Sequence, residues 1–239
     1  MKTLIVKSGS TFDELIDSQG DFDSWIIKTS NGNLTEYHVL DITKENISSV
    51  NEQYESVIIT GSHSNVTEQP PWQQNLMRLI EQFLHQQIPV LGICYGHQLL
   101  ATIFGGEVQF HPNGGEYGIT IIEKTEQASN DPIFAHMPSH FYGYVSHSQT
   151  VSTLPDSATT LAFSQMEPHQ AVRYDKHVWG VQFHPEFSRQ ITSFYFEKMR
   201  HTVKNGVFVN PNSVEFDGRI GKLILPLFLK HVQSMLETS

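Results

Sequence analysis

The chain has 239 residues, of which 38% are hydrophobic and 17% charged, a composition typical of a globular protein with a sizeable buried core. Its formal net charge of −10 argues against a nucleic-acid-binding surface, which requires clustered basic residues. A single cysteine excludes an internal disulfide, and the sequence has neither a signal-peptide pattern nor an apolar run of membrane-spanning length. We therefore expect a cytoplasmic protein that contacts no membrane.

Short apolar runs alternate with helix-like segments in the first part of the chain, which is the pattern of parallel strands connected by helices. The predicted strands cover residues 3–6, 37–40, 56–59 and 90–93. Helices are expected to start near Asp21 and after Pro71-Trp72, where apolar side chains recur at helical spacing. Open parallel sheets bind ligands at the carboxyl ends of their strands, so the loop at residues 60–64 is a candidate for part of a site.

The stretch from Val90 to Gly106 combines a strand, a sharp turn and a helix around the only cysteine of the chain. The turn reads Gly92-Ile-Cys94-Tyr-Gly96, and its glycines let the backbone reverse so that the central side chain projects from the fold. The N-terminus of the following helix favours a thiolate. This pattern predicts a nucleophile elbow with cysteine in place of serine. A buried structural cysteine is the alternative, and the glycine frame argues against it.

Beyond Gly106 the sequence changes to short strand-like runs separated by glycine and proline. These runs predict antiparallel hairpins added to the sheet, at residues 108–111, 118–122, 159–163, 171–174 and 178–183. An amphipathic helix is expected over residues 189–204. The last apolar segment, residues 220–235, is predicted to be interrupted at Pro226. We expect it to pack on its own domain, with a docking surface for another chain as the alternative.

The stretch Trp179-Gly-Val-Gln-Phe-His184-Pro-Glu186 carries a second set of reactive side chains. His184 and Glu186 are two residues apart, so both face the same side of an extended chain. The carboxylate then accepts a hydrogen bond from one imidazole nitrogen, and the other nitrogen exchanges a proton with a thiol. We therefore predict a catalytic triad of Cys94, His184 and Glu186. A purely structural imidazole is the alternative for His184 taken by itself.

Together these two stretches resemble the motifs of the class I (triad) glutamine amidotransferases, in the family's order of cysteine, histidine and glutamate. The resemblance implies a three-layer α/β/α sandwich of flavodoxin-like type, with a mixed, mainly parallel central sheet and a strand–turn–helix nucleophile elbow. It also implies an oxyanion hole formed by the backbone N–H groups of Gly61 and Tyr95.

The same resemblance implies substrate contacts from Gln98, Ser146 and His147. Gln149 stands where the family often has aspartate. Among the members, the chain is similar to stand-alone, GMP-synthase-like amidotransferases, with which it shares the segment Gly20-Asp-Phe-Asp and the helix after Pro71-Trp72.

We expect a single amidotransferase domain over residues 1–239, with a catalytic core at 1–187 and a C-terminal helical extension at 188–239. A full GMP synthetase carries an ATP-pyrophosphatase domain after its glutaminase domain. The residues after 187 are too few for one and contain no phosphate-binding glycine loop, so ATP is not expected. The histidines do not have the spacing of zinc proteases, so no metal and no other cofactor is expected.

The predicted reaction is hydrolysis of the side-chain amide of L-glutamine to glutamate and ammonia through a γ-glutamyl thioester on Cys94. In the family the ammonia usually passes to a synthetase, so the resemblance implies that the partner is an ammonia-accepting synthetase subunit. One alternative is a γ-glutamyl peptidase that uses the same chemistry on γ-glutamyl peptides. A non-catalytic binding or regulatory protein on this fold is another. The third, a different elbow-cysteine hydrolase, is disfavoured by the His-Pro-Glu sequence.

Overall fold

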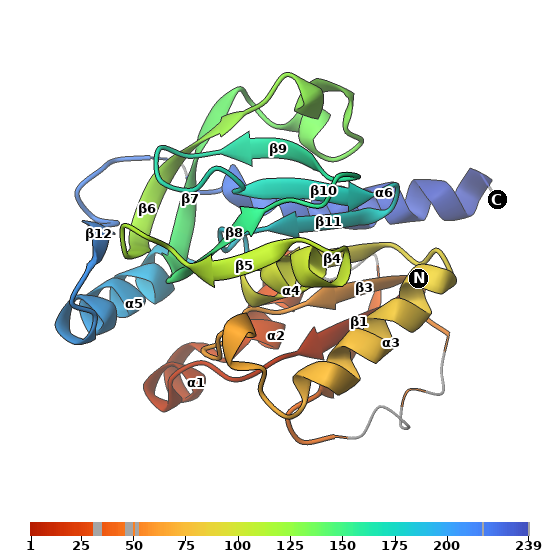
Figure 1. Cartoon of the computed structure of the whole chain (residues 1–239), viewed down its shortest axis with the longest axis horizontal. Coiled ribbons are helices and arrows are strands. Elements are labelled where there is room, and N and C mark those ends of the chain that lie inside the picture. The colour runs from red at the N-terminus through yellow and green to blue at the C-terminus, as the bar shows by residue number, and fades with distance from the viewer. Residues whose placement is uncertain (31–34, 46–49, 51–52, 217, 239) are drawn as a thin grey trace.

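The computed structural model of the chain describes residues 1–30, 35–45, 50, 53–216 and 218–238, and within these it has a central sheet of ten strands with helices on both faces (Figure 1). The strands of this sheet are β1 (Lys2–Lys7), β2 (Glu36–Asp41), β3 (Ser56–Ile59), β4 (Val90–Ile93), β6 (Gly115–Lys124), β7 (His140–His147), β9 (Thr159–Phe163), β10 (Ala171–Asp175), β11 (Val178–Val181) and β12 (Gly206–Val209). Their order is β12-β6-β9-β10-β11-β4-β3-β1-β2, with β7 paired to β6. Two further strands, β5 (Glu107–Phe110) and β8 (Gln149–Thr153), form a separate small sheet.

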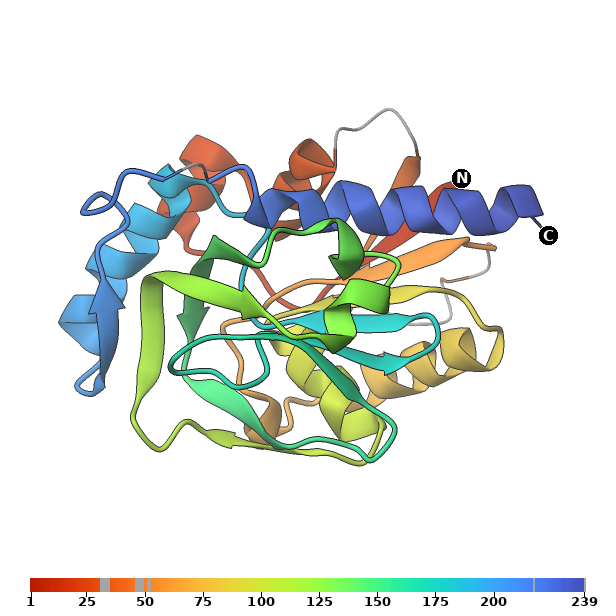
Figure 2. The same ribbon diagram turned by 90° about the horizontal axis from the view of Figure 1, so that it is seen from above.

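The helices form the outer two layers of the sandwich. They are α1 (Asp13–Gln19), α2 (Phe22–Thr29), α3 (Gln73–His85), α4 (Tyr95–Ile103), α5 (Arg189–Thr202) and α6 (Ile224–Thr238), with short 3-10 turns η2 (Val66–Glu68), η3 (Gln127–Asn130), η4 (Phe134–His136) and η5 (Gly221–Leu223). Helices α2 and α6 cover one face of the sheet, and α3 and α4 cover the other (Figure 2). This arrangement confirms the predicted α/β/α sandwich with a mixed, mainly parallel sheet.

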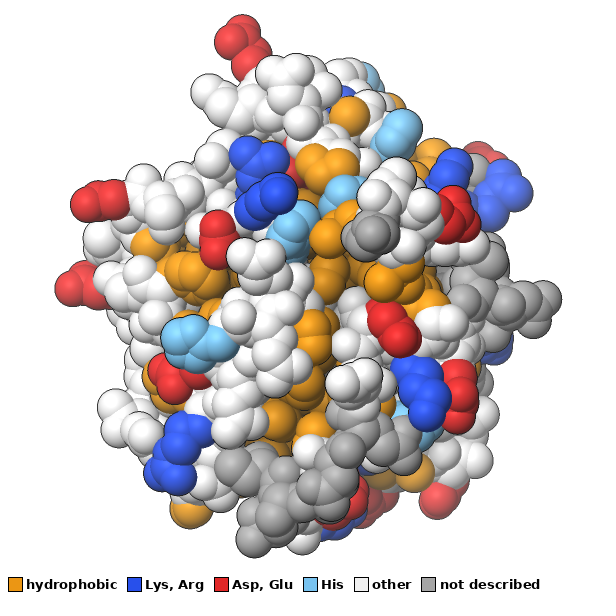
Figure 3. Space-filling model, turned by 90° about the vertical axis from the view of Figure 1, so that its right-hand side faces the viewer, with side chains coloured by type: hydrophobic (Ala, Val, Ile, Leu, Met, Phe, Trp, Pro, Cys, Tyr) orange, Lys and Arg blue, Asp and Glu red, His pale blue; other side chains and the backbone are white. Residues whose placement is uncertain are grey.

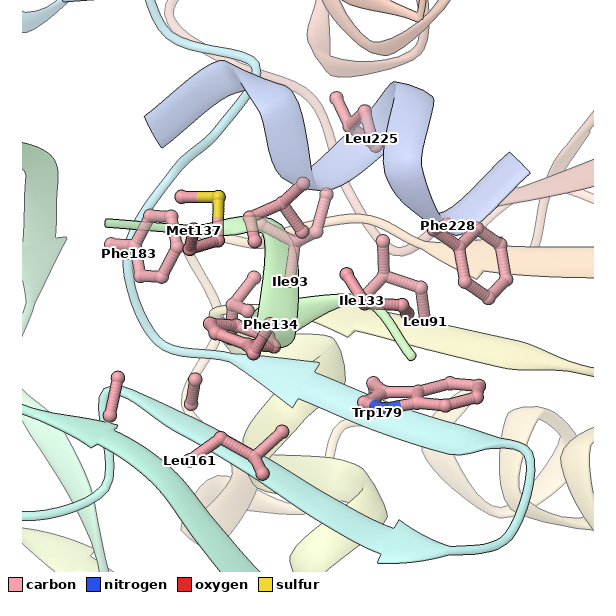
Figure 4. Close-up of a cluster of buried hydrophobic side chains, with 14 of the residues drawn as sticks. Leu91, Ile93, Ile133, Phe134, Met137, Leu161, Trp179, Phe183, Leu225 and Phe228 are labelled. Carbon is pink, nitrogen blue, oxygen red and sulfur yellow. The ribbon is translucent and has the colours of Figure 1, made fainter. Parts of the chain in front are cut away.

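Each face of the sheet has its own apolar core because successive side chains of a strand point to opposite sides. In β1, Ile5 packs in the cluster beneath α2 and α6, whereas Leu4 and Val6 pack in the cluster beneath α3 and α4. Figure 4 shows part of the first cluster, in which Leu225 and Phe228 of α6 lie above the strands. None of the described helices is both long and apolar enough to span a bilayer.

The parallel part of the sheet positions the candidate site. Strand β4 lies between β3 and β11 and is parallel to both of them. Since parallel strands end at the same edge, the loops that follow these strands leave the sheet side by side. These are the loops that carry Gly61, Cys94 and His184.

The hairpin region departs from the sequence-based expectation in two respects. β9, β10 and β11 form an antiparallel series within the main sheet, as expected, and β6 pairs antiparallel with β7. The run at residues 108–111 does not join that sheet. It forms β5, which pairs with β8 in the separate small sheet. β7 and β8 were not predicted, because histidine, serine and glycine interrupt their apolar residues and only pairing with partners distant in sequence selects the extended form.

The C-terminal segment differs from the prediction in two ways. Pro226 does not interrupt the helix, since α6 runs without a break from Ile224 to Thr238. Pro226 is the third residue of α6, where the missing N–H would have no acceptor within the helix. The predicted helical extension at residues 188–239 also contains strand β12, which pairs with β6, so it is not helical throughout.

Acidic and basic side chains are interspersed on the face of the molecule seen in Figure 3. The lysine and arginine side chains that are visible on this face lie among acidic, apolar and uncharged side chains. This face therefore lacks the continuous basic surface by which proteins bind nucleic acid, in keeping with the net charge of −10.

The packing of α6 predicts that its inner face contributes to the stability of the domain. Phe228 is fully buried against Trp179, whereas Leu223, just before the helix, is 39% exposed. We expect Phe228→Ala to lower the free energy of unfolding by about 3–5 kcal/mol, because it leaves a cavity in the core. The matched control Leu223→Ala should cost less than about 1 kcal/mol. Urea denaturation followed by circular dichroism measures both, and equal effects would contradict the inward packing of α6.

Candidate active site

A cavity of about 140 Å³ lies where the loops after β4 and β11 meet the end of β7. Most of the residues predicted for the site line this cavity: Cys94, Tyr95, Gln98, Ser146, His147 and His184. Gly61 lies beside it, next to His184, and Glu186 lies behind His184. The structure thus brings together segments that are up to 125 positions apart in the chain, from Gly61 to Glu186.

Cys94 occupies a strained turn between β4 and α4. Its backbone has φ 50° and ψ −100°, a conformation that non-glycine residues rarely adopt. A Cβ atom at Gly92 would lie 2.5 Å from the backbone of Gly96, and one at Gly96 would lie 2.8 Å from the carbonyl oxygen of Ile59. Both positions therefore require glycine, because strand and helix approach too closely for any side chain. This geometry confirms the predicted nucleophile elbow.

His184 is fixed from several directions in the loop after β11. Its backbone N–H donates to the carbonyl of Tyr144 at 2.8 Å, and its Nδ1–H donates to Glu186 Oε1 at 2.7 Å. The ring of Phe187 stacks on the imidazole with 4.0 Å between centroids and an angle of 19° between planes. Both His184 and Glu186 are buried. The imidazole can therefore turn little, and its other nitrogen is directed by these contacts.

Gly61 brings the loop after β3 against the same imidazole. A Cβ atom at this position would lie 3.0 Å from His184 Cε1 and 3.7 Å from Cys94 Cβ. The carbonyl oxygen of Gly61 accepts hydrogen bonds from Ser8 Oγ at 3.1 Å and from Thr60 Oγ1 at 2.8 Å. The backbone of the predicted oxyanion loop is thus held in place beside the thiol. The other predicted donor, Tyr95, is the first residue of α4, whose N–H has no acceptor within the helix.

The charges around His184 favour its protonated form. Burial lowers the pKa of His184, but the Glu186 carboxylate and the Cys94 thiolate, which also hydrogen-bonds the imidazole, raise it to about 10. At neutral pH the ring is therefore an imidazolium. The Glu186 carboxylate and the sulfur of Cys94 both lie beside this ring.

A second buried ion pair joins His147, which lines the cavity, to Glu116. His147 Nε2 donates to Glu116 Oε2 at 3.2 Å, and His147 Nδ1 donates to the carbonyl of Gln149 at 3.0 Å. Burial lowers the pKa of His147, but the hydrogen bond and charge of Glu116, with the charges of Glu167 and Cys94, raise it to about 9. His147 is therefore also an imidazolium, since both ring nitrogens act as donors.

Gln98 belongs to a hydrogen-bond network beneath the cavity. Its Nε2 donates to the carbonyl of Gln149 at 3.0 Å and to Gln182 Oε1 at 2.8 Å. The side-chain oxygen of Gln149 in turn accepts from the backbone N–H of Val66 at 3.0 Å. These contacts fix the segment after β7 against α4 and η2. Gln98 thus has a structural role whether or not it also contacts substrate.

Part of the cavity wall was not predicted from the sequence. His63 lies in the loop after β3, and its Nε2 is hydrogen-bonded to the hydroxyl of Tyr195 at 2.8 Å. Tyr195 lies on α5, a segment for which the sequence predicted only an amphipathic helix. His63 lies within the loop at residues 60–64 that was predicted to form part of a site, and that position was the available signal; its hydrogen bond to Tyr195 was not predicted. Among the described residues, no group of three histidine, cysteine, aspartate or glutamate side chains is placed to hold a metal ion.

The Glu116–His147 pair predicts a pH-dependent contribution to stability. The pKa of His147 is raised from the ordinary value of roughly 6.5 in the unfolded chain to about 9 in the folded protein. The contribution is therefore complete below about pH 6.5 and is lost as pH rises through about 9. Wild-type stability should fall more steeply than that of Glu116→Gln across this range, in urea titrations at several pH values, because Glu116 is the main group that raises this pKa. Glu123→Gln, an exposed position on the same strand, serves as control and should behave like wild type. Parallel pH profiles for wild type and Glu116→Gln would refute the charged pair.

Comparison with known proteins places these features in a family. Residues 14–200 match the family model described as glutamine amidotransferase class-I. GMP synthase (glutamine-hydrolyzing) of Thermosipho melanesiensis is 32% identical over 239 residues, which cover 95% of this chain and 43% of that protein. A Methanococcus maripaludis protein named as one subunit of GMP synthase (glutamine-hydrolyzing) is 40% identical over 106 residues, which cover 44% of this chain and 54% of the other. The chain thus matches less than half of the Thermosipho protein.

Solved structures agree in fold. A glutamine amidotransferase from Thermotoga maritima superposes with a TM-score of 0.74 at 23% identity, covering 97% of each chain. A glutamine amido transferase from Methylobacillus flagellatus gives a TM-score of 0.69 at 20% identity, covering 99% of this chain and 94% of the other. With the family model matching most of its length and the elbow cysteine in its expected turn, this chain belongs to the class I glutamine amidotransferases.

Proposed function

We propose that the protein hydrolyses the side-chain amide of L-glutamine to glutamate and ammonia through a γ-glutamyl thioester on Cys94. The observation that carries the proposal is that Cys94 in its strained turn and His184, hydrogen-bonded to Glu186, lie together against Gly61 at the wall of a small cavity. It combines a nucleophile, a proton donor and an orienting carboxylate in the order that thioester chemistry requires.

In the first half of the proposed reaction the Cys94 thiolate attacks the side-chain carbonyl carbon of glutamine. A carbon–sulfur bond forms, and the carbonyl oxygen becomes an oxyanion that accepts hydrogen bonds from the backbone N–H groups of Gly61 and Tyr95. The imidazolium of His184 then gives its proton to the amide nitrogen. The carbon–nitrogen bond breaks, ammonia leaves, and a γ-glutamyl thioester remains.

In the second half, water hydrolyses the thioester. Neutral His184 takes a proton from the attacking water, and the carbon–sulfur bond breaks to release glutamate and restore the thiolate. Glu186 keeps Nδ1 of the imidazole protonated throughout, so that Nε2 is the nitrogen that exchanges protons. The stacked ring of Phe187 holds the plane of the imidazole during both proton transfers.

The dimensions of the cavity support a small substrate. At about 140 Å³ it is well below the roughly 300–1,000 Å³ typical of sites for drug-sized ligands, which favours a single amino acid over a peptide. Ser146 and His147 also line the cavity, and we assign them, with Gln98, to the amino-acid end of glutamine.

The relatives suggest where the ammonia goes. The Methanococcus maripaludis relative is named as one subunit of GMP synthase, which indicates an enzyme assembled from separate chains. We propose that this chain likewise delivers ammonia to a synthetase subunit. The whole domain over residues 1–239 would then act as the glutaminase component of such an assembly.

A substrate panel tests the proposed activity. Purified protein should release ammonia from L-glutamine and much less glutamate from γ-glutamyl dipeptides, because the cavity accommodates one amino acid. An electrophilic glutamine analogue should add one equivalent per chain, on Cys94. Cys94→Ser should lose both the activity and the label. Faster turnover of γ-glutamyl dipeptides would instead make the protein a γ-glutamyl peptidase, and labelling of Cys94→Ser at unchanged stoichiometry would remove Cys94 from the reaction.

The two partners of Cys94 should differ in importance. His184→Ala removes the group that moves both protons, so activity should fall to the background of Cys94→Ser. Glu186→Ala only mis-orients the imidazole, and the loss should be smaller, on the order of 10- to 10³-fold in kcat. Steady-state ammonia release, with circular dichroism to verify folding, measures both. Full activity in Glu186→Ala would exclude Glu186 from the site.

A further inference from the structure

A second cavity lies on the opposite side of the Glu186 carboxylate. It has a volume of about 410 Å³, and Glu186 forms part of its wall together with Lys28 of α2, Arg219, and Lys222 of η5. Cys94 and His184 are not among its lining residues, so it is distinct from the substrate cavity. Glu186 therefore lies between His184 on one side and this second cavity on the other.

Only one of the two carboxylate oxygens of Glu186 has a hydrogen-bond partner among the described residues. Oε1 accepts the hydrogen bond from His184, whereas Oε2 is buried and has no hydrogen-bond partner among them. A buried carboxylate oxygen without a partner is costly and draws a nearby cation or donor toward it. Such an oxygen at the wall of a cavity is a position where a further hydrogen-bond donor or cation can bind.

Lys222 is the cation placed to meet this demand. Its side chain is half-buried, and burial lowers the pKa of its ammonium group; the Glu186 carboxylate acts against this by attracting the charge, and Lys28 repels it. Among the described residues no ion pair within 4.0 Å joins Lys222 to any acidic side chain, Glu186 included, and its flexible four-carbon stem lets the ammonium group move within the cavity. The backbone beneath it is fixed, because Gly221 packs against the carbonyl of Tyr142 in β7.

We propose that Lys222 is a positioning residue of the active site: from the C-terminal segment, it pairs with Glu186 Oε2 through the second cavity and so keeps Oε1 on His184. The proposal rests on the proposed glutaminase function for its kinetic readout. It assigns to η5 and α6 a role in catalysis beyond covering the apolar face of the sheet.

Removing the charge of Lys222 tests this role. In the full-length protein, Lys222→Met should lower kcat for glutamine hydrolysis on the order of tenfold and leave KM unchanged, because the cavity of Lys222 does not touch the substrate. Lys222→Arg keeps the charge and should restore most of the activity. The matched control Lys28→Met removes a charge from the same cavity without removing the partner of Glu186, and it should retain wild-type kcat. Should Lys222→Met fail to fold, Lys222→Gln is the second charge-neutral variant.

A second measurement separates this inference from the proposed function. Cys94 is the only cysteine, so its alkylation by iodoacetamide at neutral pH reports the thiolate–imidazolium pair without any substrate. Lys222→Met should slow the alkylation severalfold, and Lys28→Met should not. If the wild type does not hydrolyse glutamine, the proposed function fails, and the alkylation rates still decide the role of Lys222. Equal rates in wild type and Lys222→Met, equal losses in both methionine variants, or no rescue by arginine would overturn the proposal.

Discussion

The parallel pairing of β4 with β3 on one side and β11 on the other is the constraint on which the site depends. Three loops leave the sheet at one edge, each from the end of a different strand, and they carry Gly61, Cys94 and His184. Hydrogen bonds between the strands set the spacing of these loops before any side chain contributes. A Cβ atom at Gly61 would lie 3.0 Å from the imidazole, so the register tolerates almost no shift. The reactive geometry is thus a property of the sheet, which its two apolar cores hold rigid.

The electrostatics of the site follow from placing opposite charges together where water is excluded. His184 and His147 are both buried beside a carboxylate, and in both the pKa is raised although burial alone would lower it. The two pairs differ in what they serve. The charge on His184 adjoins the sulfur atom and can move to a leaving group. The charge on His147 is held between Glu116 and a backbone carbonyl, so it fixes the cavity wall. One fold therefore pairs histidine with glutamate twice, once beside the sulfur of Cys94, where we propose proton transfer, and once in the cavity wall.

The C-terminal segment contributes both to the packing of the sheet and to the charges around the site. Its helix α6 completes the apolar core on one face of the sheet, and η5, just before it, brings Lys222 to the reverse side of Glu186. Lys222 can influence the imidazole of His184 only through the carboxylate of Glu186. Stability and catalysis would then be separable within one segment: Phe228 serves the core, and Lys222 serves the site.

The features of this protein that depend on neighbouring residues could be predicted from short stretches of its sequence. The glycine frame around Cys94 and the spacing of His184 and Glu186 depend on a few adjacent residues, so the elbow and the paired imidazole and carboxylate could be predicted without knowledge of the fold. The tertiary structure alone decided what depends on distant partners. Strand β8 pairs with β5 away from the main sheet, Glu116 meets His147 across β6 and β7, and His63 meets Tyr195 of α5. None of these partners leaves a periodic signal, because each contact is selected by packing between segments that are far apart in the chain.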